Sequence, residues 1–376
     1  MSITEVKHQD QAIEALQLGL QCDRLAHGYI FAGPAGVGKR TAAREFAKIL
    51  LCLDLQKLDA PAERQSPYGP KQWFDSCGRC QSCRLVDAGT HPDYHPIYKE
   101  LVTLLPGKER HKATELGIDV IREALIEKVA LHPNLGNSKV FIVHEAHRLS
   151  RSAQNAMLKT LEEPPSSTYI ILITERLSSL LPTIQSRAQA VQFRLLPDGF
   201  VRSRLAEAGA EPRDQRFFAH LAPGQLGLAL ELWELGVYDL NERLGKDLAS
   251  LDLTGSDNLA QWIVDQGKEL CERAKSRTPP ETMAGPSESE LGRTALRRMF
   301  GLIAGFYRDA LRQKLGFDNE SLINVGQQEF VDRLAGRMSV EQLQDKIESI
   351  REAQGQLDAN VNQNLLVSNL LARLSG

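Results

Sequence analysis

The chain has 376 residues, of which 42% are hydrophobic and 25% are charged, a composition typical of a globular protein with two or three domains. Its 45 basic and 48 acidic residues give a formal net charge of -3, which excludes a basic surface over the whole molecule for binding nucleic acid. The sequence has no leader pattern and no run of about eighteen apolar residues. We therefore expect a cytoplasmic protein without a membrane segment.

The first part of the chain predicts a helix, a strand and a second helix. Apolar residues recur at roughly helical spacing over residues 9–25. The apolar run Tyr29 to Ala32 then predicts a strand, and Thr41 to Leu50 a helix. Between them lies GPAGVGKRT, residues 33–41. A glycine-rich turn in this context indicates a phosphate-binding loop, because its backbone N–H groups can surround phosphates at the positive end of a helix.

The loop supplies the predicted nucleotide ligands, which are Gly33, Gly36, Gly38, Lys39, Arg40 and Thr41. Lys39 can reach the β- and γ-phosphates, and Thr41 can donate to an α-phosphate. The motif requires Ser or Thr directly after the lysine to ligate Mg²⁺, yet Arg40 occupies that position. ATP or ADP is therefore a candidate cofactor, and Mg²⁺ lacks its usual ligand. The alternative is a glycine-rich turn that serves only packing.

The pattern weakens between residues 52 and 98, where prolines, glycines and cysteines replace the regular elements. We expect an insertion without a core of its own, ordered by a metal. The spacing of its cysteines favours a structural zinc site with the ligands Cys52, Cys77, Cys80 and Cys83. The alternative is four unrelated cysteines. Cys22 and Cys271 stand alone, and we expect both in the core.

Regular alternation of helices and strands returns after Gly117. The pattern predicts helices over residues 117–129 and 152–161, and buried strands over 140–143 and 169–173. Alternation of this kind predicts an α/β domain with a doubly wound, largely parallel sheet. Beyond Pro197 only helical patterns remain, interrupted by the proline-rich residues 277–287, which we expect to form an exposed loop.

The two residues that follow the strand over 140–143 stand where an ATP-hydrolysing site has its acidic residues. There an acidic residue normally holds Mg²⁺, and a carboxylate beside it orients the attacking water. His144 occupies the first place and Glu145 the second. Glu145 can still act as a base, but a neutral imidazole is a poor ligand for Mg²⁺. Two supports of the metal are therefore missing.

Four features of the sequence carry a resemblance to a known family. NAMLKTLEEPP, residues 155–165, resembles the hallmark segment of the clamp-loader branch of the AAA+ family. The Ser-Arg-Cys motif of that branch is matched by Ser186-Arg187-Ala188 apart from its cysteine. RLAHGYIFAGP, residues 24–34, and the four-cysteine module are similar to the same branch. The resemblance covers about residues 5–230.

The resemblance implies three domains. These are a P-loop AAA+ core over residues 1–197 with a zinc module at about 52–98, a helical lid over 198–245, and an all-helical collar over 246–376. It also implies that Arg187 is an arginine finger, which acts in trans on the ATP of a neighbouring subunit. Thr174 lies where the family has a polar sensor residue. Gly227 occupies the place of the lid arginine that senses the γ-phosphate in active members.

Arg40, His144 and Gly227 are three departures that all work against hydrolysis. They resemble the largely inert stator subunits of the branch, with Glu145 as a vestigial base and little or no hydrolysis by the chain alone. The resemblance implies the gamma/tau and delta subunits of the bacterial DNA polymerase III loader as partners, and the sliding clamp and primed DNA through the complex. The alternatives are a gamma/tau-like ATPase motor subunit and an unrelated signalling or DNA-repair ATPase of the same superfamily.

Overall fold

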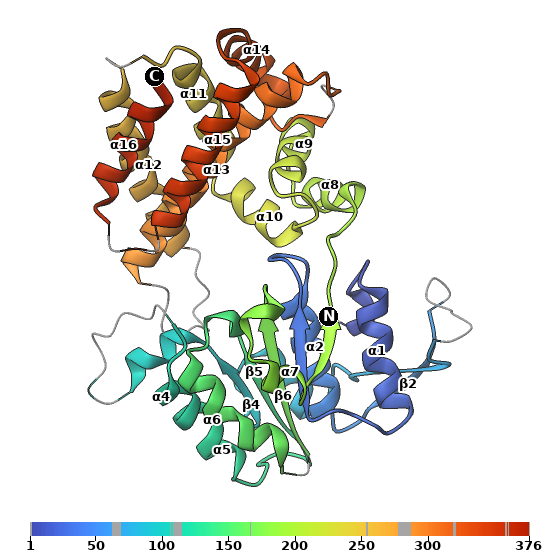
Figure 1. The fold of residues 1–376 in the computed structure, drawn as a ribbon. Coiled ribbons are helices and arrows are strands. Elements are labelled where there is room, and N and C mark those ends of the chain that lie inside the picture. Colours follow the sequence, from blue (N-terminus) through green and yellow to red (C-terminus); the bar gives the residue numbers. More distant parts are fainter. Residues whose placement is uncertain are drawn as a thin grey trace. The chain divides into compact units, whose positions relative to one another are not determined.

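The computed structural model describes residues 2–61, 69–105, 107, 115–165, 167–252, 255–276, 287–318, 321–357, 359 and 361–375. The chain forms two compact units, one built on the residues up to Leu196 and the other on those from Pro197 onward (Figure 1). The proline-rich loop predicted over 277–287 lies outside the described residues except for Ser287. Its hydroxyl group accepts a hydrogen bond from the backbone N–H of Glu290 and so begins a helix.

The first unit contains a parallel five-stranded sheet with the order β4-β5-β6-β1-β7. Its strands are β1 (Gly28–Ala32), β4 (Tyr94–Ile97), β5 (Lys139–Val143), β6 (Thr168–Thr174) and β7 (Gln189–Gln192). β1 lies between β6 and β7, with Gly28 opposite Ile170 and Tyr29 opposite Gln189. The predicted parallel α/β sheet is confirmed.

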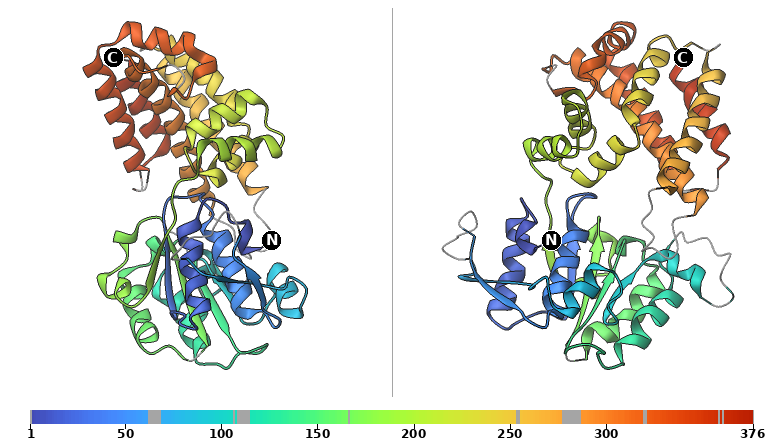
Figure 2. Two further views of the ribbon diagram at one scale, coloured as in Figure 1. Left: turned by 90° about the vertical axis from the view of Figure 1, so that its right-hand side faces the viewer. Right: turned by 180° about the vertical axis from the view of Figure 1, so that it is seen from behind.

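Helices cover both faces of this sheet, as the views from the side and from behind show (Figure 2). They are α1 (Asp10–Gln21), α2 (Lys39–Leu51), α3 (Gln81–Asp87), α4 (Ile118–Ile121), α5 (Glu127–Val129), α6 (Arg151–Glu162) and α7 (Pro182–Gln185), with a π-helical turn at Arg122–Ile126. Tyr29 and Phe31 pack in the core with α1 and α2. Ile30 packs on the opposite face with α4 and α6, because successive strand residues point to opposite faces.

The stretch 52–98 is more ordered than its sequence predicts. β2 (Gln56–Asp59) and β3 (Gln72–Asp75) form an antiparallel ribbon, and the fully buried Trp73 joins the core around α1 and α2. The last part of the stretch is β4, an edge strand of the main sheet. The expectation of an insertion throughout 52–98 was therefore wrong at β4. Pro96 conceals this strand in the sequence, and an edge strand tolerates a proline that a central strand excludes.

The regular elements described in the second unit are all helical, as predicted. They are α8 (Asp198–Glu207), α9 (Pro212–Leu221), α10 (Leu226–Glu234), α11 (Val237–Ala249), α12 (Ser256–Lys275), α13 (Glu288–Lys314), α14 (Gln328–Arg337), α15 (Val340–Gln356) and α16 (Gln363–Ser375). α13 is central, because α12, α14 and α15 all pack against it and its Phe300 and Phe306 are fully buried. Among the described helices, none has the length and apolar character that crossing a bilayer requires.

Candidate nucleotide and metal sites

The glycine-rich loop joins the end of β1 to the start of α2. Gly33, Gly36 and Gly38 have φ values of 151°, 69° and 100°, in a region that favours glycine. A Cβ atom on Gly33 would also collide with the carbonyl oxygen of Phe193. Gly38 is the N-cap of α2, so the free N–H groups of the first helical turn lie directly after the loop. This geometry suits a phosphate group.

Lys39 is buried and engaged with its own loop. Its Nζ atom donates to the carbonyl oxygen of Gly33 at 2.5 Å and to that of Pro34. Burial lowers the pKa of this ammonium group to about 8, although Glu175 acts in the opposite direction. A bound phosphate would compete with the two carbonyl groups for the lysine. Arg40 is exposed and Thr41 is half-buried in the same turn.

His144 directly follows β5, and its side chain is buried as an apolar side chain would be. Only 6% of the residue is exposed, and its ring stacks on that of Tyr98 with centroids 4.4 Å apart. Within the described part of the chain, neither ring nitrogen has a hydrogen-bond partner. Burial, and then the nearby Arg40, lower the pKa of His144 to about 3. The imidazole is therefore neutral near pH 7 and unsuited to Mg²⁺.

Glu145 is held by cations of the same chain. Its Oε2 atom accepts a hydrogen bond from Lys99 Nζ at 2.7 Å, and its Oε1 atom lies 3.6 Å from Arg148 Nε. Burial raises the pKa of this carboxyl group, but Lys99, Arg148 and Arg40 together lower it below its ordinary value. Glu145 is thus a carboxylate that is paired with Lys99 and lies near Arg148.

Sequence reasoning missed Lys99 and Tyr98. The pairing of Ile97 in β4 with Val143 in β5 places the residues that follow these two strands side by side. Parallel strands end at the same edge of a sheet, so Tyr98 meets His144 and Lys99 meets Glu145. The apolar residue Ile97 at the end of β4 was the sequence signal for this strand, and the nearby Pro92 and Pro96 obscured it.

Thr174 ends β6, and its hydroxyl group is engaged in a local turn. The Oγ1 atom donates to the carbonyl oxygen of Arg176 at 2.9 Å and accepts from the backbone N–H of Arg176 at 3.1 Å. Thr174 is completely buried. Both hydrogen bonds stay within residues 174–176, so this hydroxyl group closes its own turn.

Arg187 follows α7 and pairs with a carboxylate of its own chain. Its Nη2 atom lies 2.6 Å from an oxygen of Glu162, at the end of α6. Its Nη1 atom donates to the carbonyl oxygen of Thr183 and to the hydroxyl group of Ser186. The side chain is 34% exposed, and that of Glu162 is 46% exposed. An ion pair this accessible contributes little free energy, so a more highly charged partner can displace Glu162.

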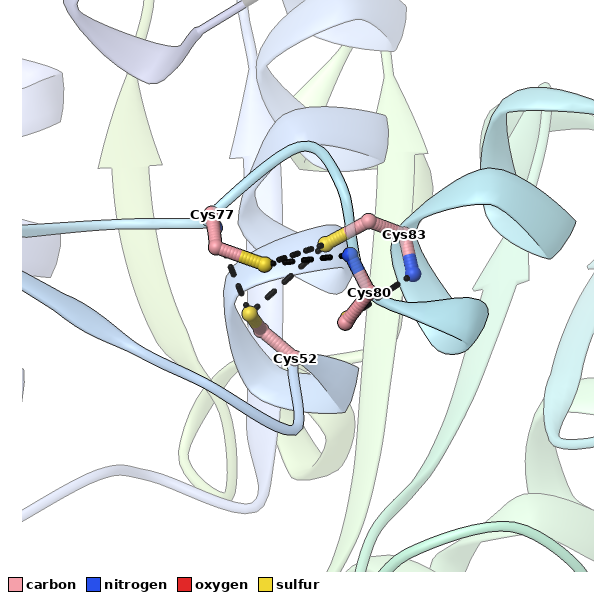
Figure 3. Close-up of side chains that lie close together, drawn as sticks. All are labelled: Cys52, Cys77, Cys80 and Cys83. Carbon is pink, nitrogen blue, oxygen red and sulfur yellow. Dashed lines mark hydrogen bonds between the residues drawn. The ribbon is translucent and has the colours of Figure 1, made fainter.

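The four predicted cysteine ligands converge at the C-terminal end of α2 (Figure 3). Their sulfur atoms lie within 4.8 Å of one another. The Sγ atom of Cys83 lies 3.6 Å from that of Cys52 and 4.0 Å from that of Cys77. Sulfur atoms on a tetrahedral zinc ion at Zn–S distances of about 2.3 Å would be about 3.8 Å apart. The cluster can therefore hold a metal ion.

Backbone N–H groups point at these sulfur atoms. Cys77 donates to Cys52, Cys80 to Cys77, and Cys83 to Cys80, at 3.3–3.4 Å. Burial would raise the pKa of Cys80, but hydrogen bonds from the backbone N–H groups of Cys83 and Leu53 lower it to about 6. Burial raises the pKa of Cys52 and of Cys83 in the absence of a metal ion. Hydrogen bonds of this kind stabilise thiolates, which are the form that binds a metal. The donor set thus fits a closed structural site.

The cluster is tied to α2 by further buried contacts. The hydroxyl group of Ser82 donates to the carbonyl oxygen of Leu51. Lys48, which is buried in α2, forms a 2.7 Å ion pair with Asp87 at the end of α3.

The two cysteines outside the cluster differ from each other in burial. Cys271 is buried as expected, but the prediction for Cys22 was wrong, because it is exposed at the C-terminal end of α1.

A glycine loop between a central parallel strand and a helix is the arrangement of P-loop proteins. Two family models match the chain: "DNA polymerase III, delta subunit" over residues 8–197, and its C-terminal counterpart over residues 291–376. The DNA polymerase III subunit delta' of Pseudomonas aeruginosa is 30% identical over 352 residues, which cover 93% of this chain and 91% of that protein. The chain belongs to the DNA polymerase III delta' subunit family.

Other relatives match over shorter lengths. The delta' subunit of Escherichia coli is 33% identical over 63% of each chain. The tau/gamma subunit of Haemophilus influenzae is 32% identical over 54% of this chain and 25% of that protein. The alignments thus span somewhat less than two thirds of the Escherichia coli relative and a quarter of the tau/gamma relative. Membership of the delta' family removes the hypothesis of an unrelated signalling or DNA-repair ATPase.

Proposed function

We propose that this chain is a stator subunit of the bacterial DNA polymerase III clamp loader. In the cytoplasm it completes a ring with gamma/tau and delta subunits, and the assembled ring places the sliding clamp on primed DNA. The AAA+ core over residues 1–197 carries the nucleotide and zinc sites. Residues 198–245 act as the lid, and residues 246–376 act as the collar that joins the ring.

The observation that carries the stator role is the replacement or internal pairing of the groups that would hold the metal and activate the attacking water. Glu145 is paired with Lys99, and His144 is buried and neutral at the metal-binding position. Arg40 replaces the metal-ligating hydroxyl, and Gly227 leaves the lid without its arginine. Lys39 and the free N–H groups of α2 still suit phosphates, so the loop binds ATP or ADP without needing Mg²⁺.

The catalytic contribution of the chain is Arg187, acting in the ring on the ATP of a neighbouring subunit. An arginine in that role stabilises the charge that develops on the transferring phosphoryl group. The ion pair with Glu162 keeps the guanidinium group oriented until the neighbour's phosphates displace the carboxylate. The structural zinc ion on the four cysteines fixes α3 and β3 to the C-terminal end of α2.

Reconstitution tests this function directly. Purified gamma/tau and delta subunits, with or without this chain, are mixed with the clamp, primed DNA and ATP, and clamp loading is measured. We expect loading only with the chain present. Loading of equal rate without it would reject the stator role.

A second candidate function is a gamma/tau-like ATPase motor subunit of the same loader. Its support is the intact geometry of residues 33–39 and the similarity to tau/gamma relatives. The two candidates differ in the ATP turnover of the purified chain.

A further inference from the structure

Gln9 is a buried glutamine that contacts the glycine-rich loop from outside the loop motif. It is the N-cap residue of α1, and its carbonyl oxygen accepts a hydrogen bond from the backbone N–H of Ile13 at 3.0 Å. Only 3% of Gln9 is exposed. Its side chain reaches two segments that are distant in sequence, at Val37 in the loop and at Arg194 after β7.

The amide group of Gln9 has a fixed orientation. Its Nε2 atom donates to the carbonyl oxygen of Val37 at 3.2 Å and to that of Arg194 at 2.7 Å. Its Oε1 atom accepts a hydrogen bond from the backbone N–H of Arg194 at 2.9 Å. Exchange of the amide nitrogen and oxygen would place Oε1 against two carbonyl oxygen atoms, so only one orientation satisfies all three partners.

The hydrogen bond to Val37 acts on the peptide group that joins Val37 to Gly38. In a trans peptide group the C=O and N–H bonds point to opposite sides. Gln9 holds the C=O side, and it therefore also sets the direction of the N–H group of Gly38. A hydrogen bond to the C=O group polarises the peptide group and strengthens its N–H as a donor. Gly38 is the N-cap residue of α2, at the position that suits a phosphate.

The strand end that Gln9 binds also contacts the start of the loop. A Cβ atom on Gly33 would collide with the carbonyl oxygen of Phe193. The backbone N–H of Phe193 donates to the carbonyl oxygen of Ala32, directly before the loop, at 2.7 Å. The loop is therefore held at its first glycine by this strand end and, further along, by Gln9. The same strand end leads to Pro197, where the second unit begins.

Gln17 of the same helix shows what the additional bond of Gln9 contributes. Its Nε2 atom donates to the carbonyl oxygen of Phe74 at 2.8 Å, and its Oε1 atom accepts from the N–H of Phe74 at 2.7 Å. Gln17 is completely buried. Both glutamines thus make the same paired contact with one backbone residue, and Gln9 adds the hydrogen bond to Val37.

We propose that Gln9 is a positioning residue for phosphate binding by the loop. It holds the N–H group of Gly38 toward the phosphates and links the occupied loop to Arg194. Gln9 acts through the peptide group between Val37 and Gly38 and does not touch the ligand. The inference rests on the proposed binding of ADP or ATP by the loop, and it extends that site to a residue outside the motif.

Calorimetric titration of the purified full-length chain with ADP and with pyrophosphate, both in EDTA, tests the proposal. Gln9→Met keeps the length of the side chain and should bind both ligands about tenfold more weakly, because a hydrogen bond to a charged group contributes about this factor or more. Gln17→Met loses a paired contact of the same kind and should keep the original affinities. Unchanged affinities in Gln9→Met, or an equal loss in Gln17→Met, would overturn the proposal.

The two ligands and a second variant separate a role at the phosphates from other roles. A loss in Gln9→Met that is confined to ADP would overturn the proposal, because Gln9 would then serve the base. Gln9→Glu keeps an acceptor for Arg194 but, as a carboxylate, has no donor for Val37. This variant should weaken both ligands at least as strongly as Gln9→Met, and original affinities in Gln9→Glu would also overturn the proposal.

Hydrogen exchange in the unmodified chain tests the link to Arg194 without any substitution. The N–H groups of Arg194 and Phe74 each donate to the Oε1 atom of a glutamine, so they form a matched pair. ADP at about ten times its Kd should slow exchange at Arg194 by at least about threefold and leave Phe74 unchanged. Equal slowing at both groups, or none at Arg194, would overturn the link.

Failure of this inference is distinguishable from failure of the proposed nucleotide site. If neither ADP nor pyrophosphate binds the unmodified chain, the nucleotide site is rejected together with the role of Gln9. If both ligands bind and the substitutions at Gln9 change neither affinity, only the role of Gln9 is rejected.

Discussion

The two ends of α2 carry two sites of different completeness. At the C-terminal end, all four sulfur donors of a metal site converge within 4.8 Å. At the N-terminal end, the glycine loop has the shape that suits phosphates, but Lys39 donates to its own loop and Glu145 is paired with Lys99. Backbone geometry alone is therefore weak evidence for hydrolysis. The contacts that each side chain makes decide whether a site can serve as a structural metal site or as a catalytic site.

The largest expected effect concerns the metal site. Cys83→Ser should abolish the binding of one zinc ion per chain, measured by elemental analysis, and should lower the melting temperature by about 10 °C or more. Structural zinc supplies several kcal/mol of folding free energy or more, and about 1 kcal/mol shifts the melting of a unit of this size by about 2–4 °C. Cys22→Ser, at an exposed cysteine outside the cluster, is the matched control. Full stability of Cys83→Ser would remove the contrast between the two ends of α2.

The next effect concerns Arg187 in the reconstituted loader. If Arg187 is the proposed arginine finger, Arg187→Ala should slow ATP hydrolysis at the neighbouring site by about 10³-fold, the lower range for removal of such a residue. Assembly of the complex, followed by gel filtration, should be unchanged. Arg84→Ala, at an exposed arginine of α3, is the control. Unchanged ATP turnover in Arg187→Ala would reject the catalytic role and leave only the ion pair with Glu162.

A smaller effect follows from the burial of His144. Its pKa is about 3 in the folded chain and about 6.5 when unfolded, so the unfolded state binds more protons between these values. Stability therefore falls as the pH drops below about 6.5. Between pH 7 and 4.5, the free energy of unfolding of the unmodified chain should fall by about 2–3 kcal/mol more than that of His144→Phe, which keeps a ring against Tyr98. Urea unfolding at both pH values measures this, and identical losses in the two proteins would contradict a buried neutral imidazole.

The smallest expected effect is the pH dependence of nucleotide binding. Burial lowers the pKa of Lys39 to about 8, so its charge is present at pH 7 and is lost as the pH rises through this value. Calorimetric titration with ADP in EDTA should show affinity that falls about tenfold between pH 7 and 9.5. Lys39→Met should bind weakly at both values. Binding that requires Mg²⁺, or that does not change with pH, would show that the loop works differently.

Much of the fold follows from local patterns in the sequence. The apolar runs of β1, β5 and β6 and the periodicity of α2 and α6 each predict their element within a few residues, because buried parallel strands and amphipathic helices have distinct patterns. Ser150 is the N-cap of α6, and its side chain accepts a hydrogen bond from the backbone N–H of Ala153. β4 and β7 were missed, since each is a short edge strand with few apolar residues.

The candidate sites were predictable where their residues are close in sequence. Three of the four cysteines lie within seven residues, and the loop is continuous. The pairs Lys99 with Glu145 and Arg187 with Glu162 join distant segments, and only the folded arrangement of strands and helices brings them together. The sequence therefore indicates which groups are missing from the nucleotide site, whereas the fold shows what holds the groups that remain.

The most direct test of the account is the ATP turnover of the purified chain with Mg²⁺, compared with that of its Lys39→Ala variant. The engagement of Glu145 by Lys99, together with Arg40 and His144 at the metal-binding positions, predicts equal and negligible turnover in the two proteins. Sustained Mg²⁺-dependent hydrolysis that Lys39→Ala abolishes would contradict the stator role and favour the motor subunit.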